Sequence, residues 1–180
     1  MTNATFIRRF VNWRSFLWAG LLANIAKFIV FYLTGNDPLA NGAGLLPNAS
    51  PLLQNLLGVL IFMAIGQIFY ALVYVLIIHN ASGFAATEPL NGIMKAVVAT
   101  FFQIYLGFLA MPWIFNLHFV GPDPSNPTQT VDLNLVPWDW GDFWLRFPIY
   151  FVYSLVMVFV YKSPAEKQAQ QAAAWLPNKP

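Results

Sequence analysis

The stretch LLANIAKFIVFY, Leu21–Tyr32, is almost wholly apolar and yet contains a lysine, Lys27. An apolar segment surrounds it from about Trp13 to Leu33, and this segment has the roughly 20 residues that a helix needs to cross a bilayer. Because the segment is that long and a lysine interrupts it, we predict a retained membrane helix rather than a cleaved signal peptide.

The composition of the whole chain agrees with this prediction. Hydrophobic residues make up 58% of the 180 residues and charged residues only 9%, against roughly 25% charged residues in soluble domains. A chain of one-domain length cannot hide so much apolar surface in water, so the sequence predicts an integral membrane protein. The absence of a basic run excludes a nucleic-acid partner, and the absence of cysteine excludes disulfides and thiolate sites.

Four hydrophobic segments are long enough to span a bilayer, so we predict an all-α bundle of four transmembrane helices. The expected spans cover about 13–33, 52–79, 93–116 and 143–161, within a transmembrane domain at 1–162. The sequence SPAE at Ser163–Glu166 has the pattern of a helix-starting capping box. Residues 163–180 are therefore expected to form a short cytoplasmic helical tail, helical to about Trp175.

The distribution of basic residues predicts the orientation of the bundle. Seven of the nine Lys and Arg residues fall on one side of the expected spans. They are Arg8, Arg9, Arg14, Lys95, Lys162, Lys167 and Lys179. Basic flanks remain in the cytoplasm, so we expect both termini to be cytoplasmic and the chain to be a multi-pass protein of the inner (plasma) membrane.

Lys27 is expected to lie deep in the bilayer. At 1.5 Å per residue it is ~21 Å from the inner end of its helix and ~9 Å from the outer end. The side chain can snorkel outward, but helical side chains lean toward the N-terminus, which is the opposite direction. Gly20, Asn24 and Lys27 share one helical face, and its small neighbouring residues favour contact with another helix over contact with lipid.

A polar layer is predicted at mid-depth from the distance of each residue to its span boundary. Its members are Asn24, Lys27, Gln67 and Gln103, with Tyr70, Tyr105, Tyr150, Tyr153 and Ser154 nearby. These groups either hydrogen-bond to one another across the bundle or line a polar path. No acidic residue is expected at the depth of Lys27. We therefore hypothesise a partner outside this chain, either a carboxylate of another subunit, an anionic lipid or an anionic substrate.

The sequence contains no recognisable catalytic or nucleotide-binding motif. No pair of carboxylates is expected inside a helix, where burial could tune an acid and a base. We therefore predict no enzyme, no catalytic residue, no cofactor and no metal. His79 and His118 are expected at opposite ends of the bundle, so each is either a solvated side chain or, alone, a ligand for a haem or pigment.

The expected outer loop runs from His118 to Asp142, and the tryptophan-rich sequence PWDWGDFW, residues 137–144, lies where it meets the fourth span. Its candidate docking residues are Trp138, Asp139, Trp140, Asp142 and Trp144. Clustered tryptophan is typical of binding hot spots, although the same residues suit an anchor lying on lipid head groups.

The expected spans two to four contain the short motifs Gly66-Gln67-Ile68-Phe69, Tyr74, Met111-Pro112, Tyr150 and Tyr153. With these motifs the chain resembles a group of small four-helix bacterial membrane proteins of unknown function. Ser154 replaces the glycine that those proteins tend to have, and the loop before the fourth span is longer. The resemblance covers about half of the chain, and it implies a bacterial inner-membrane location without implying an activity.

Taken with the lack of catalytic motifs, the small-residue face and the unpaired lysine favour an accessory or scaffold subunit of a larger membrane complex. Its expected partners are membrane lipids and other membrane subunits or further copies of the chain. The alternative is a small oligomeric transporter or channel whose polar path would use the mid-depth residues.

Overall fold

The computed structural model describes residues 11–34, 48–79, 89–106, 120–122, 128, 130–132 and 140–175. Within this part of the chain the fold is helical, as predicted, apart from one short hairpin. The hairpin pairs β1 (Val120–Pro122) with β2 (Thr130–Asp132) in antiparallel register. It lies in the stretch where the sequence predicted only a loop.

Among the described residues, three helices are long and apolar enough to cross a membrane. The first is α2 (Trp13–Leu33), which has the predicted bounds. The second is the continuous helix Pro51–Ile78, and the third is the segment Phe143–Val160 of α9 (Trp140–Val160). Where a further span was expected, the structure has α7 (Pro89–Tyr105), and residues 107–116 of that expected span lie outside the described residues.

The second of these helices changes its winding along its length. It consists of α4 (Pro51–Ala64), the π-helix η1 (Ile65–Tyr70), α5 (Ala71–Val73) and the π-helix η2 (Tyr74–Ile78). It begins normally, because the Ser50 hydroxyl accepts a hydrogen bond from the backbone N–H of Leu53 at 3.4 Å and Pro51 occupies the first turn. In the π turns the backbone hydrogen bonds join residues five apart instead of four, as in the bond from the Ala71 N–H to Gly66 O.

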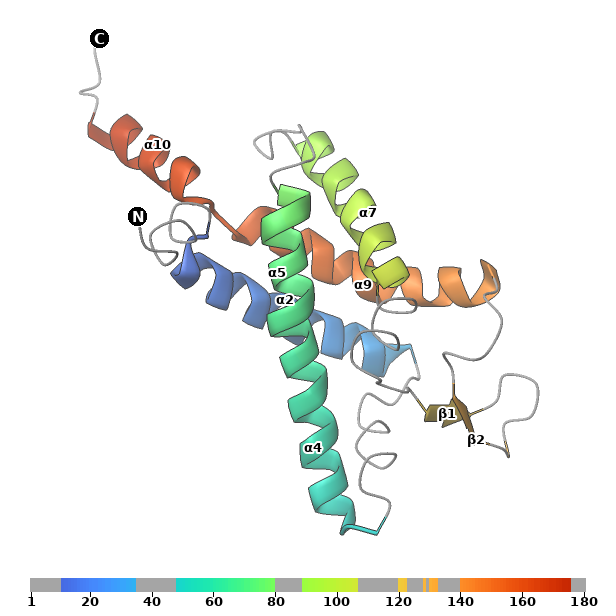
Figure 1. The fold of residues 1–180 in the computed structure, drawn as a ribbon. Helices are drawn as coiled ribbons and strands as arrows, with labels where there is room; N and C mark the ends of the chain where they lie inside the picture. The colour runs from blue at the N-terminus through green and yellow to red at the C-terminus, as the bar shows by residue number, and fades with distance from the viewer. Residues whose placement is uncertain are drawn as a thin grey trace.

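Helix α9 is the centre of the described bundle (Figure 1). Both α2 and α7 pack along it, while η1 crosses α2 and η2 lies against α7. The close packing depends on small residues, because Ala19 and Ala23 of α2 and Ala96 and Ala99 of α7 have no exposed surface. The outer faces of these helices carry large apolar side chains, which is the surface that lipid solvates.

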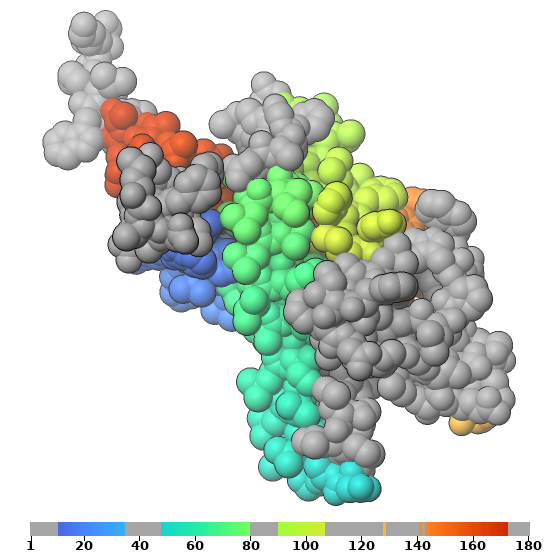
Figure 2. Space-filling model, viewed as in Figure 1, coloured from blue at the N-terminus to red at the C-terminus, as the bar shows by residue number. Residues whose placement is uncertain are grey.

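Two helical segments project from this packed centre. The first turns of α4 extend past the other described helices (Figure 1), and Figure 2 shows their surface reaching beyond them. At the other end, three residues separate α9 from α10 (Pro164–Trp175), which extends away from the bundle (Figure 1). The predicted C-terminal helix is therefore confirmed, with the predicted end at Trp175.

Candidate functional site

The face of α2 that carries Gly20, Asn24 and Lys27 lies against the second apolar helix, so it meets protein, as the small residues predicted. A Cβ atom added to Gly20 would come within 2.5 Å of the Gln67 side chain. On the opposite side of the crossing, a Cβ atom added to Gly66 would overlap the Asn24 side chain. The two glycines therefore permit the close approach of α2 and η1.

Three polar side chains at this crossing bond to backbone carbonyls of neighbouring helices. The Asn24 amide Nδ2 donates to Met63 O at 3.4 Å, and the Gln67 Nε2 donates to Phe16 O at 3.4 Å. The buried Tyr153 hydroxyl donates to Gly66 O, in the π-helical turn, at 2.6 Å. The same carbonyl accepts the backbone N–H of Ala71, so the Tyr153 hydroxyl is a second donor that joins α9 to η1.

Gln103 belongs to a different contact, between α7 and α9. Its Oε1 accepts a hydrogen bond from the Ser154 hydroxyl at 3.3 Å, and the Thr100 hydroxyl donates to Ser154 Oγ at 3.2 Å. The structure therefore separates the predicted polar layer into two helix seams. Tyr105 belongs to neither of them, because its side chain is 60% exposed on the outside of α7.

Lys27 is only 3% exposed and lies among aromatic rings. Its Nζ is 4.0 Å from the ring centroid of Phe62, 5.2 Å from that of Tyr70, 5.6 Å from that of Tyr153 and 5.7 Å from that of Tyr150. These four rings, from α4, η1 and α9, are called the aromatic cage below. Each ring lies within the roughly 6 Å at which its π face attracts a cation.

Within the described part of the chain, no carboxylate pairs with Lys27 and no hydrogen-bond acceptor meets its Nζ. The hypothesis of an external partner did not anticipate the cage, which gives the ammonium an electrostatic partner from within the chain. An external partner for Lys27 stays a prediction.

Several buried polar atoms have no hydrogen-bond partner among the described residues. They are Asn24 Oδ1, Gln103 Nε2, the Tyr74 hydroxyl and His79 Nδ1. The first two belong to the predicted mid-depth residues, so each amide is satisfied on one side only. An unpaired buried amide group costs about 1–3 kcal/mol, which makes these positions candidates for a bound water or ligand.

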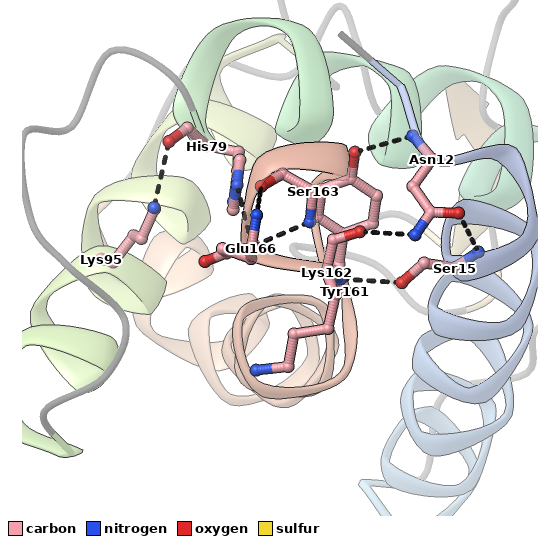
Figure 3. A network of polar contacts seen from close by, with 8 residues as sticks. All are labelled: Asn12, Ser15, His79, Lys95, Tyr161, Lys162, Ser163 and Glu166. Carbon is pink, nitrogen blue, oxygen red and sulfur yellow. Dashed lines mark hydrogen bonds and ion pairs between the residues drawn. The ribbon is translucent and has the colours of Figure 1, made fainter. Parts of the chain in front are cut away.

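A second group of polar side chains joins the start of α2 to the end of α9 (Figure 3). Asn12 caps α2, since its Oδ1 accepts from the backbone N–H of Ser15 at 3.3 Å, and its Nδ2 donates to Lys162 O at 3.0 Å. The Ser15 hydroxyl in turn accepts from the backbone N–H of Lys162 at 2.7 Å. Two side chains from one helix thus fix the backbone of the segment between α9 and α10.

Glu166 links α10 to the end of the second apolar helix (Figure 3). Its carboxylate accepts from the backbone N–H of Ser163 at 2.8 Å, and the Ser163 hydroxyl accepts from the backbone N–H of Glu166 at 3.3 Å, as the predicted capping box requires. The same carboxylate lies 3.5 Å from His79 Nε2. Nearby, the Lys95 ammonium donates to His79 O at 3.1 Å, at a helix end that favours a cation.

The electrostatics of Glu166 follow from these contacts. Partial burial acts to raise the pKa of its carboxyl. The hydrogen bonds from Ser163 and the charges of His79 and Lys162 outweigh that effect and hold the pKa below its usual value. Sequence reasoning did not find the contact between His79 and Glu166, because no local pattern connects residues so far apart. His118, the other candidate ligand, lies outside the described residues.

Helix α9 begins within the predicted docking residues. Trp140 and Asp142 lie in its first turn rather than in the loop, and Trp144 lies in the same helix, where the fourth span was predicted. An acidic residue near a helix N-terminus favours helix formation there. The Trp144 side chain is 58% exposed and packs edge-on against Phe143, with ring centroids 5.1 Å apart. Trp138 and Asp139 lie outside the described residues.

Comparison with protein-family models, curated proteins and solved structures finds no match to this chain. The resemblance to small four-helix membrane proteins therefore stays a prediction from the sequence motifs.

Proposed function

We propose that the chain is an accessory or scaffold subunit of a larger membrane complex. We include in this proposal the finer arrangement expected from the sequence, namely four spans in the inner membrane with both termini in the cytoplasm. The single observation that carries the proposal is the first half of α4, which extends past the other described helices (Figure 1).

This part of α4 presents a row of leucines. Leu52, Leu56 and Leu60 follow one another at intervals of four residues, which places them on one helical face, and they are 72%, 52% and 63% exposed. Among the described elements, the main neighbour of α4 is η1, its own continuation. A leucine row of this kind suits packing against a helix of another membrane subunit, with the ridges of one helix in the grooves of the other.

The polar contacts support a structural role. Asn24, Gln67 and Tyr153 each donate to a backbone carbonyl of a neighbouring helix. Such hydrogen bonds hold membrane helices together. Their chemistry is that of a stable framework.

Site-specific photo-crosslinking in the native membrane tests the proposal. A photoreactive side chain at Leu56 should give a discrete protein adduct in constant ratio to the chain. The matched control is Ile29 of α2, which has the same 52% exposure and should give lipid adducts. An adduct of twice the chain mass would identify a second copy as the partner. Lipid adducts at both positions, together with a lone monomer on native gels in mild detergent, would refute the proposal.

A small transporter or channel is the second candidate function. The unpartnered atoms Asn24 Oδ1 and Gln103 Nε2 favour it, because polar groups without partners inside a membrane are typical of substrate paths. Purified protein in liposomes should then show solute flux that Gln103→Leu abolishes. An inactive preparation of correctly folded protein, tested with cations, anions and neutral solutes, would leave the accessory role as the better proposal.

A further inference from the structure

The aromatic cage around Lys27 has the geometry of a cation-binding site. Four ring centroids lie 4.0–5.7 Å from the Nζ atom. Aromatic rings carry negative charge on their faces, and cages of such rings are used to recognise alkylated ammonium ions. Among the described residues, no carboxylate pairs with the Lys27 ammonium, so the four rings are its electrostatic partners.

The walls of the cage are held by contacts that do not involve Lys27. Phe62 packs edge-on against Phe28 and Phe31, with centroid distances of 5.8 and 5.6 Å. Tyr70 packs in the same way against Tyr150 at 5.6 Å and Tyr153 at 6.2 Å. Each ring of the cage therefore has at least one other aromatic neighbour. The rings should stay in place when the lysine side chain is shortened.

The position of Tyr153 is fixed further by its hydroxyl. This group donates to Gly66 O at 2.6 Å and so anchors the ring of α9 to the backbone of η1. A cage whose walls are already in place loses little conformational entropy when it binds a ligand, and such preorganisation favours affinity.

We propose that the aromatic cage is a binding site for small alkylammonium ions and that Lys27 is its built-in occupant. The ligand class follows from the chemistry of the walls. Ring faces attract a positive charge, and the short apolar stem of an alkylammonium ion suits the surrounding side chains. This site is additional to the proposed accessory role and does not depend on it.

Chemical rescue of the Lys27→Ala variant tests the site. The substitution removes Cγ, Cδ, Cε and Nζ, and n-propylammonium restores the same four atoms from solution. In detergent-solubilised full-length protein, propylammonium chloride should raise the Tm of Lys27→Ala saturably, by at least about 2 °C. Neutral 1-propanol and the anion propionate, which match it in size, should not do so.

A second variant separates a cage effect from a general salt effect. Phe62 supplies the nearest ring, and Phe62→Leu keeps an apolar side chain without a π face. In Lys27→Ala combined with Phe62→Leu, half-saturation should require roughly 3–30 times more propylammonium. The proposal is wrong if propylammonium has no effect, if propanol acts equally, or if Phe62→Leu leaves the concentration dependence unchanged.

If Lys27→Ala does not fold on its own, the yield of folded protein tests the proposal instead of the Tm. The variant is then expressed and solubilised with propylammonium or with 1-propanol present throughout. Folded protein recovered only with propylammonium supports the cage as a cation site. Equal recovery with both compounds, or with neither, overturns it.

Discussion

Single atoms decide how closely the two apolar helices can cross. At Gly66 no Cβ fits, because the Asn24 side chain already occupies that space. Asn24 in turn is held by its hydrogen bond to Met63 O. A glycine that touches a fixed, buried neighbour is under tighter constraint than one that touches a mobile surface side chain.

Gly66→Ala should therefore destabilise the fold by about 1–3 kcal/mol, the usual cost of overpacking. Gly92→Ala is the control, because the added Cβ would meet the Phe159 ring at 2.7 Å, and that side chain is 43% exposed and free to rotate. Unfolding titrations in detergent measure both. The double variant Asn24→Ala with Gly66→Ala should recover part of the loss, and an unchanged stability of Gly66→Ala would contradict the steric argument.

Among the helices, regular α2 was easier to predict from the sequence than the contacts made by the π turns of the second apolar helix. Helix α2 was predicted with its observed bounds because length and apolar composition are local properties. The aromatic cage was not predicted. A period of 3.6 residues does not tell whether Phe62 and Tyr70 lie on the same face of the helix, because a π-helix changes the number of residues per turn between them.

The Gly66 carbonyl of η1 gives a test of this element. Tyr153→Phe removes one of the two donors to Gly66 O and leaves the backbone N–H of Ala71, so it should lower stability by about 0.5–1.5 kcal/mol, the net contribution of one hydrogen bond. Tyr32→Phe is the control, because Tyr32 is 70% exposed on α2. Thermal unfolding in the same detergent compares the two. Equal effects from both variants would show that the hydroxyl of Tyr153 does not hold η1.

Helix α10 should be anchored in a pH-dependent way. The pKa of Glu166 is lower in the folded protein than its usual value of 4.5, so its ionised form favours the docked helix. That contribution is complete above about pH 4.5 and is lost as the pH falls through the folded value. A spin label at Gln170 should become more mobile over this acidic range, and Glu166→Gln should remove the transition. A transition that persists in Glu166→Gln would assign it to another group.

The whole molecule could be predicted only in part. The lengths of the apolar segments predicted three of the helices. The capping box predicted α10, because Ser163 and Glu166 are three residues apart and their pattern can be read locally. The contact between Glu166 and His79 joins residues far apart in the chain, as does the hydrogen bond from Asn12 to Lys162. Tertiary contacts of this kind leave no periodic signal in a single sequence.

The absence of cysteine makes the proposed orientation directly testable. A cysteine introduced at Asn48, which is exposed before α4, should react with a membrane-impermeant thiol reagent in cells whose inner membrane is intact. A cysteine at Ala165 of α10 should react only after that membrane is opened. The opposite pattern would invert the orientation, and reaction at both positions in intact cells would indicate an odd number of spans.

Two of the four rings around Lys27, Tyr150 and Tyr153, belong to α9. A growing chain leaves the ribosome from its N-terminus, so the lysine enters the bilayer more than a hundred residues before these rings are made. During that interval two of the four rings around the ammonium have not yet been synthesised, and an unpaired charge in hydrocarbon is costly. A chain that stalls before Tyr150 would therefore lack two of the four rings that lie around this charge.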